Sequence, residues 1–249
     1  MSGHLTGPGG KVRLYVEAPL SAGARVVPGE QQAHYLLHVM RARAGEAVSL
    51  FNGRDGEWLA RLDAVTKRSC VLLCEARTEA QSDVPDVWLC FAPVKKTPAD
   101  YVVQKATELG ARALWPVFTR RTIVTRINEE RMRANAVEAA EQSGRLTVPG
   151  IREAVTLEKL LANWPAGRRL FFCDEGGEAR AAADAMRGAT GPCAILTGPE
   201  GGFEPVEREL IRAHPAVTAV ALGPRILRAD TAALSALAIW QAMAGDWMD

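Results

Sequence analysis

Residues 194–210, AILTGPEGGFEPVEREL, decide the fold class of this chain. An apolar run typical of a buried strand ends in a glycine-containing loop, and Phe203 and Pro205 then open a helix. Glycines in such a loop let backbone amides approach a ligand closely. The spacing is neither GxGxxG nor GxxxxGKS/T, so the dinucleotide-binding and P-loop motifs are both excluded. Taken alone, the segment predicts either a ligand-binding loop or a tight turn without a ligand.

A second segment, residues 217–237 (VTAVALGPRILRADTAALSAL), repeats the order strand, loop and helix. Ile226 and Leu227 stand between two arginines, although polar residues dominate most surface turns. Apolar side chains at this place indicate the wall of a pocket, and Thr231 is the predicted cap of the following helix. Ligands of open α/β sheets bind outside the carboxyl ends of the strands. We therefore expect the two loops to form one crevice.

The chain from residue 87 to residue 249 alternates strands and helices throughout. We predict buried strands at 87–93, 113–118, 168–175, 192–198 and 217–223, and helices at 97–110, 127–144, 203–214 and 230–245. The first of these helices has Thr97 as its predicted N-cap and ends at Gly110. This alternation predicts an α/β domain with a mostly parallel sheet that is covered by helices on both faces.

Residues 12–78 follow another pattern, in which short apolar runs alternate with turn residues. We predict strands at 12–16, 47–51, 57–65 and 70–76, a turn at 52–56 and one helix within 30–46. This pattern favours a small β-barrel that carries one helix. Residues 1–11 are predicted to be a disordered lead-in, and the polar stretch 79–86 to be the linker between two domains.

Composition supports an ordinary globular protein, with 48% hydrophobic residues, 24% charged residues and a formal net charge of +1. The charge alone gives no sign of a nucleic-acid partner, although a local basic face is compatible with it.

The five cysteines include no CxxC pair, so we expect reduced cysteines and no metal site. His34 and His38 share a helix face, but no third ligand is evident. No apolar stretch suits a membrane span or signal peptide, so we expect a cytoplasmic protein.

Several ordered motifs closely resemble the RsmE family, bacterial enzymes of the SPOUT class that methylate N3 of a uridine in small-subunit ribosomal RNA. The resemblance covers nearly the whole chain from about Val12. Its most specific parts are Glu108-Leu109-Gly110, Gln142-Ser143-Gly144-Arg145 and Gly198-Pro199-Glu200-Gly201-Gly202. RLYV at 13–16, LFNGRDGEW at 50–58 and LGPRILRADTA at 222–232 add to it. One departure is Asp230, where the family usually carries glutamate.

The resemblance implies a PUA-like, RNA-binding β-barrel at 12–78 and a SPOUT methyltransferase domain at 87–249 whose C-terminal segment forms a trefoil knot. It also implies a homodimer and the cofactor S-adenosylmethionine, held largely by backbone groups, with apolar side chains around the adenine. The residues expected at the cofactor are Leu196, Thr197, Gly198, Glu200, Gly201, Gly202, Leu222, Gly223, Ile226, Leu227, Arg228 and Thr231.

Chemistry suggests further roles for charged residues. Uracil N3 carries a proton that must leave, and arginine cannot accept it because its pKa is too high. Arg228 is therefore expected to stabilise the developing anion or to position the substrate. Two roles are open to the carboxylates of Glu200 and Asp230, either to accept the proton or only to stabilise a helix N-terminus. The residues expected to contact RNA are Arg13, Arg41, Arg43, Lys95, Lys96, Arg120, Arg121 and Arg145.

Three other functions compete with this interpretation. Another SPOUT enzyme acting on a different atom of transfer or ribosomal RNA fits the glycine loops, although the N-terminal motifs and PRILRADTA argue against it. A non-catalytic RNA-binding assembly factor would not need intact glycine loops. A nucleotide-binding protein that uses GPEGG for phosphate would lack the lysine and hydroxyl of a P-loop.

Overall fold

The computed structural model describes residues 12–248, except residue 95 and residues 176–178. The predicted lead-in, residues 1–11, and Lys95 lie outside the described residues. The chain divides into two compact units. The first comprises residues 1–83 and 140–147, and the second comprises residues 84–139 and 148–249. The segment 140–147, which lies between two stretches of the second unit in sequence, therefore packs with the first unit.

The first unit contains a five-stranded sheet in the order β1-β3-β4-β5-β2. Its elements are β1 (Arg13–Tyr15), β2 (Arg25–Val26), the helix α1 (Glu30–His34), which continues as a π-helical turn at Tyr35–Val39, β3 (Ala47–Phe51), β4 (Glu57–Val65) and β5 (Cys70–Glu79). The four predicted strands and the helix are confirmed. The strand β2, only two residues long, was not predicted.

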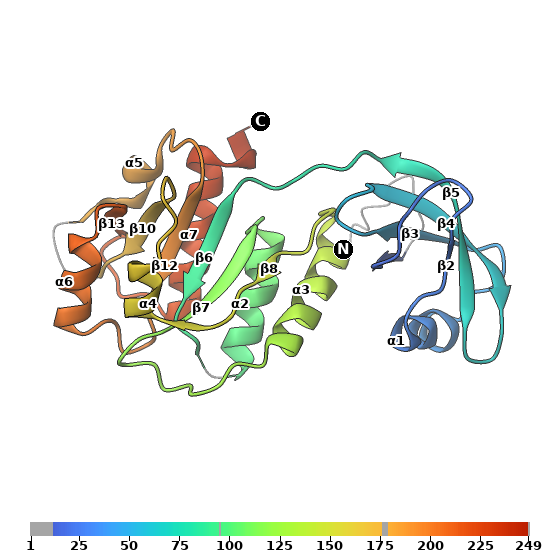
Figure 1. Ribbon diagram of the computed structural model, residues 1–249, viewed down its shortest axis with the longest axis horizontal. Helices are drawn as coiled ribbons and strands as arrows, with labels where there is room; N and C mark the ends of the chain where they lie inside the picture. The colour runs from blue at the N-terminus through green and yellow to red at the C-terminus, as the bar shows by residue number, and fades with distance from the viewer. Residues whose placement is uncertain (1–11, 95, 176–178, 249) are drawn as a thin grey trace. The chain divides into compact units, whose positions relative to one another are not determined.

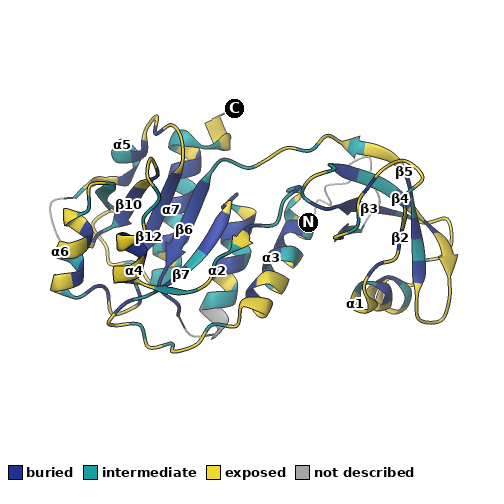
Figure 2. Cartoon of the chain, in the orientation of Figure 1, coloured by how far each residue is buried: buried dark blue, intermediate teal, exposed yellow. Residues whose placement is uncertain are grey.

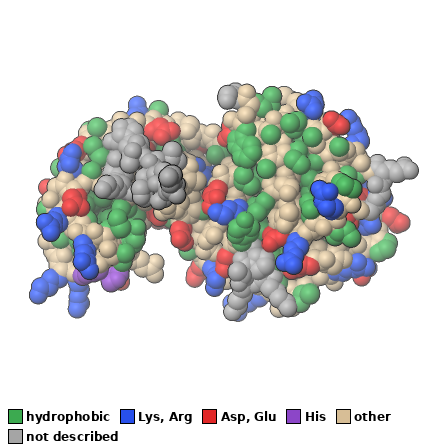
Figure 3. All heavy atoms as spheres, turned by 180° about the vertical axis from the view of Figure 1, so that it is seen from behind, with side chains coloured by type: hydrophobic (Ala, Val, Ile, Leu, Met, Phe, Trp, Pro, Cys, Tyr) green, Lys and Arg blue, Asp and Glu red, His purple; other side chains and the backbone are tan. Residues whose placement is uncertain are grey.

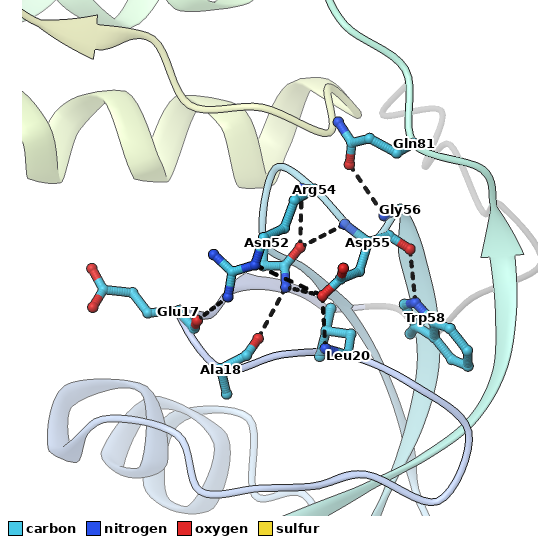
Figure 4. Close-up of polar contacts among 9 residues, drawn as sticks. All are labelled: Glu17, Ala18, Leu20, Asn52, Arg54, Asp55, Gly56, Trp58 and Gln81. Atoms are coloured by element: carbon cyan, nitrogen blue, oxygen red, sulfur yellow. Dashed lines mark hydrogen bonds and ion pairs between the residues drawn. The ribbon is translucent and has the colours of Figure 1, made fainter.

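The predicted turn at 52–56 is held by a polar network (Figure 4). The Asn52 side chain donates to Ala18 O (3.0 Å) and Asp55 Oδ2 (2.6 Å), and its Oδ1 accepts from the main-chain NH of Asp55 (2.9 Å). The hydrogen bond from Asn52, followed by that from the NH of Leu20, lowers the pKa of the Asp55 carboxyl. The turn thereby ties β3 and β4 to the segment that follows β1.

The second unit contains a sheet in the order β11-β13-β10-β12-β6-β7-β8, with β9 paired to β7 (Figure 1). Its strands are β6 (Val87–Phe91), β7 (Ala113–Phe118), β8 (Gly150–Ile151), β9 (Val155–Thr156), β10 (Arg169–Cys173), β11 (Arg180–Ala181), β12 (Cys193–Thr197) and β13 (Val217–Ala221). All recorded pairs are parallel, which confirms the predicted parallel sheet. Its central strands are buried (Figure 2).

Helices cover both faces of this sheet, as predicted. Side chains of α2 (Lys96–Glu108), α3 (Glu129–Ser143), α5 (Ala182–Met186) and α7 (Ala229–Ala244) share one hydrophobic core. Those of α4 (Leu157–Ala162) and α6 (Pro205–Ala213) share the core on the opposite face, and a short 3-10 turn at Asp246–Met248 follows α7. The short elements β8, β9, β11, α4 and α5 were not predicted, because their apolar runs are too brief to show a period.

The ends of two helices differ from the prediction. The helix α2 begins at Lys96, so Thr97 lies inside it rather than at its N-cap. The N-cap of α7 is Arg228, and Thr231 lies within the first turn, so the predicted cap was wrong. Gly110 follows the end of α2, as predicted, and lies close to α7. A Cβ there would lie 2.5 Å from Gln241 Nε2, which donates to Leu109 O (2.7 Å).

All five cysteines are free, in agreement with the sequence prediction. Burial raises the pKa of the Cys90 and Cys173 thiols to about 12. No helix in the described part of the chain is long and apolar enough to cross a membrane. Among the described residues, no group of His, Cys, Asp and Glu is arranged to hold a metal ion.

Candidate functional site

A cleft lies at the carboxyl ends of β10, β12 and β13, which are neighbours in the second unit's sheet. It encloses about 970 Å³, counting the part that is open to solvent. Both glycine-containing loops line it, as the sequence predicted. The residues from these loops are Thr197, Gly198, Pro199, Glu200, Gly202, Phe203, Leu222, Gly223, Pro224, Arg225, Ile226 and Leu227.

The first loop, residues 198–204, can have this shape only with glycine at particular positions. A Cβ on Gly198 would lie 2.6 Å from the Phe203 ring, which packs edge-on against Phe172 with centroids 5.1 Å apart. Gly202 has φ +66°, and a Cβ there would lie 2.2 Å from Glu175 Oε1. The glycines therefore let the ring and the carboxylate approach the main chain closely.

The side chain of Glu207 holds this loop by hydrogen bonds. It is buried at the third position of α6, where its Oε2 accepts from the main-chain NH of Glu204 (2.9 Å). Its Oε1 accepts from the main-chain NH of Arg120 (2.8 Å), in the segment after β7. In addition, Arg121 Nη1 donates to Gly201 O (2.7 Å). The side chains of Glu207 and Arg121 thus join the segment 119–128 to main-chain groups of the glycine loop.

The second loop, residues 222–228, leaves apolar side chains uncovered. Ile226 is 87% exposed, which is unusual for a residue of this kind, and Leu227 is partly exposed. Arg228 is exposed and makes no side-chain capping hydrogen bond to α7. Asp230 Oδ1 accepts from the main-chain NH of Thr231 (2.7 Å), a local role at the helix start.

A third wall of the cleft was missed by sequence reasoning. Cys173 ends β10, Asp174 and Glu175 follow it, and Asp174 is buried between two arginines of α6. Arg208 Nη2 lies 2.6 Å from Asp174 Oδ1, and Arg212 Nε lies 2.7 Å from Oδ2. The acidic pair directly after a buried strand was a usable signal, because it falls at the same sheet edge as the glycine loops.

The cleft brings together most, but not all, residues that were expected at the cofactor. Thr197, Gly198, Glu200, Gly202, Leu222, Gly223, Ile226 and Leu227 line it. Leu196, Gly201, Arg228 and Thr231 are not among its lining residues. The side chain of Leu196 instead packs in the core on the α4 and α6 side of the sheet, because successive strand residues point to opposite faces.

The residues expected to contact RNA have different environments. Arg13 is mostly buried and donates to Glu57 Oε2 (2.7 Å) and to carbonyl oxygens in the segment 140–145, so its guanidinium serves the fold of the first unit. Arg145 donates to Thr147 Oγ1 (3.0 Å). Arg41, Arg43, Arg120 and Arg121 are exposed, and Arg41 has the positive φ of 53°. Lys96 is the first residue of α2.

Comparison with known proteins shows which families the two units match. The RNA methyltransferase domain family matches residues 80–241, and the RNA methyltransferase PUA domain matches residues 27–73. The two units therefore define an RNA methyltransferase with an appended PUA domain.

Individual relatives narrow this class. A ribosomal RNA small subunit methyltransferase E from Synechocystis is 31% identical over 91% of this chain and 76% of its own length. The crystal structure of the Neisseria gonorrhoeae enzyme of that name, bound to S-adenosyl methionine, has TM-score 0.86 and 28% identity, and covers 95% of this chain and 99% of its own. A Legionella pneumophila methyltransferase with bound SAM has TM-score 0.85 and 28% identity, over 94% of this chain and 98% of its own. This chain belongs to the ribosomal RNA small subunit methyltransferase E family.

Proposed function

We propose that this protein transfers the methyl group of S-adenosylmethionine to N3 of a specific uridine in small-subunit (16S) ribosomal RNA. The observation that carries the proposal is the cleft at the carboxyl edge of β12 and β13, which is lined by the two loops whose sequences resemble those of the family. Relatives that this chain matches over 93% and 76% of their own length are named ribosomal RNA small subunit methyltransferase E, and two solved relatives hold the cofactor.

The cleft fits S-adenosylmethionine chemically. The glycine loop presents main-chain groups that can meet the polar edge of an adenine, and Leu222, Ile226 and Leu227 offer apolar surface for its faces. The strongly exposed Ile226 would lose its contact with water on ligand binding. When bound, the cofactor supplies a methyl group that its sulfonium activates for in-line displacement.

The chain's own residues must then handle the proton of uracil N3. Arg228 is exposed between Leu227 and Ala229, both of which line the cleft, so its charge can stabilise a developing uracil anion or hold the substrate. Of the two carboxylates considered from sequence, Glu200 lines the cleft, whereas Asp230 is engaged with Thr231. Glu200 is therefore the first carboxylate to test as proton acceptor.

RNA binding follows from charge and from domain type. We assign residues 12–78 as a PUA-like RNA-binding domain, 79–86 as its linker and 87–249 as the SPOUT domain. On the smaller unit, the His34 and His38 rings lie 4.8 Å apart, and Lys and Arg side chains lie beside the histidines in Figure 3. Arg41 and Arg43 are the exposed arginines that follow this helix, and an RNA partner also implies a cytoplasmic protein.

A knotted homodimer completes the proposal. The sheet order supports the knot, because β13 inserts between β10 and β11 and α7 then returns to pack on α2, β6 and β12. Apolar surface supports the dimer. Hydrophobic side chains gather on the face of the larger unit shown in Figure 3, and Ile239 and Met243 of α7 are only partly buried.

Mass mapping of small-subunit ribosomal RNA from cells with and without this gene tests the substrate. We expect one N3-methyluridine to disappear in the absence of this gene.

Calorimetry with S-adenosylhomocysteine tests the cofactor. Lack of binding would contradict the proposal that the protein is an enzyme and would favour a non-catalytic RNA-binding factor. Loss of a methyl group at another atom would point to a different SPOUT activity.

A further inference from the structure

The segment between β7 and α3, residues 119–128, carries charge that suits RNA. Its sequence, TRRTIVTRIN, contains Arg120, Arg121 and Arg126 and no acidic residue. All three arginines are exposed. Arginine pairs bidentately with phosphate and stacks on bases, so an exposed basic segment of this kind matches an RNA backbone.

The start of this segment has a fixed shape. The main-chain NH of Thr119 donates to Thr122 Oγ1 (2.9 Å), and the NH of Thr122 donates back to Thr119 O (3.1 Å). These bonds close a turn whose two central residues are Arg120 and Arg121. The arginines are therefore presented by an ordered turn, which reduces the entropy lost when they bind a phosphate.

The same turn contacts the glycine loop, residues 198–204, and the start of α6. Arg120 donates its main-chain NH to Glu207, and its Nη1 lies 3.3 Å from Glu204 Oε2. The Arg121 side chain lies along the main chain of Gly201, because a Cβ on that glycine would meet Arg121 Cβ and Cδ at 3.5 Å. Its Nη1 donates to Gly201 O at 2.7 Å. Arg121 thus holds the carbonyl of a residue flanked by two cleft-lining residues, Glu200 and Gly202.

A guanidinium has five donors, and this hydrogen bond uses one of them. The Gly201 carbonyl holds one nitrogen of the Arg121 guanidinium, while the side chain remains exposed to solvent. A cofactor that orders the glycine loop would therefore also order Arg121. A phosphate bound to the remaining donors would in turn hold the glycine loop. Linkage requires the two effects to be equal in free energy.

We propose that Arg121 couples RNA binding to cofactor binding, by bridging an RNA phosphate and the Gly201 carbonyl. The inference rests on the proposed function, because it takes the cleft as the cofactor site and RNA as the substrate. It makes cofactor and RNA binding mutually favourable. The bridge is exposed, so we expect a coupling at the low end of the usual range, about fivefold in affinity.

The test measures the affinity of the full-length protein for unmethylated small ribosomal subunits from cells that lack this gene. Each measurement is made with and without S-adenosylhomocysteine, which permits no turnover. For the unaltered protein, we expect S-adenosylhomocysteine to tighten RNA binding about fivefold. For Arg121→Ala, S-adenosylhomocysteine should still bind, but it should no longer change the affinity for the subunit. Arg121→Lys keeps the charge without the planar fork, so it should bind RNA better than Arg121→Ala and still show little coupling.

Arg126→Ala is the matched control, because Arg126 lies in the same basic segment and no contact with residues 198–204 is recorded for it among the described residues. It should weaken subunit binding equally in both conditions and keep the fivefold effect of S-adenosylhomocysteine. Equal coupling in Arg121→Ala and the unaltered protein would overturn the inference, as would an absence of coupling in the unaltered protein. A failure of the unaltered protein to bind S-adenosylhomocysteine would instead overturn the proposed function, and the inference with it.

Discussion

Glu207 Oε1 accepts a hydrogen bond of 2.8 Å from the main-chain NH of Arg120, although the two residues are 87 positions apart. The other carboxylate oxygen of Glu207 caps the start of α6 through the NH of Glu204. One buried side chain therefore joins the segment after β7 to the glycine loop. This contact, besides the glycines, helps to hold the loop that lines the cleft.

Glu207→Gln should destabilise the protein, because the new amide group turns one acceptor into a donor that faces an NH. Leaving a buried donor unsatisfied costs about 1–3 kcal/mol, so we expect a loss of this size in the free energy of unfolding. Urea denaturation measures it. Glu209→Gln, an exposed position on the same helix, is the control and should change stability little.

Neighbouring glycines of the loop should differ sharply in their tolerance of alanine. Gly202→Ala places a Cβ 2.2 Å from Glu175 Oε1, so the Glu175 side chain must shift, and the φ of +66° strains the backbone of any residue other than glycine. Gly201→Ala places its Cβ 3.5 Å from the Arg121 side chain, an ordinary contact distance. We expect Gly202→Ala to weaken S-adenosylhomocysteine binding at least tenfold in calorimetry, and Gly201→Ala to have a much smaller effect. If the two variants bound S-adenosylhomocysteine with similar affinity, cofactor binding would not depend on the shape of this loop.

Ile226→Ala should affect binding without affecting folding. Ile226 is 87% exposed, so its truncation removes little buried surface from the free protein. If Ile226 covers the adenine, the variant should bind S-adenosylhomocysteine several-fold more weakly, since each buried methylene contributes about 0.8 kcal/mol. Ile123→Ala is a suitable comparison, because Ile123 is 72% exposed but does not line the cleft. Equal binding by the two variants would remove Ile226 from the cofactor site.

Much of this cleft was predictable because strand ends can be read from sequence. The apolar runs ending at Thr197 and Ala221 locate two loops at one sheet edge, and the structure confirms that both line the cleft. The third wall was missed although the acidic pair after β10 was visible in the sequence, because no local pattern shows that β10 lies between β12 and β13. Nor does spacing reveal that Asp174 meets Arg208, a residue 34 positions away.

The predicted RNA-contacting residues show the same limit. Arg13 is expected to contact RNA because it is an arginine of the predicted RNA-binding barrel, and nothing in the sequence indicates that its guanidinium has partners within the protein. Its actual partners include Ala140 O, 127 positions away, which only the tertiary fold brings near. In contrast, Arg120 and Arg121 are exposed, but their contacts with the glycine loop were equally invisible in the sequence.

Arg228→Ala should leave the fold intact and abolish or severely reduce methylation. Its side chain is exposed and makes no capping hydrogen bond, so thermal unfolding should be nearly unchanged. The loss should appear in the rate of methyl transfer to small ribosomal subunits, because a charge that stabilises the anion acts only as the reaction proceeds. Full activity in this variant would exclude Arg228 from the site.

Arg13→Ala should destabilise the first unit rather than impair RNA binding directly. The guanidinium lies 4.5 Å from the Phe51 ring centroid, pairs with Glu57 and donates to the carbonyl oxygens of Ala140, Glu141, Gly144 and Arg145. Removing it leaves the Glu57 carboxylate, whose side chain is only 11% exposed, without this partner. Breaking a buried ion pair costs about 3–5 kcal/mol, and the residual exposure here places the expected loss near the lower value.

Hydrogen exchange should show faster opening in β1 and at the end of α3. Unchanged protection there, together with weaker RNA binding, would instead support the expectation that Arg13 contacts RNA. Arg43→Ala, at an exposed position of the same unit, provides the opposite pattern: unchanged stability with weaker RNA binding.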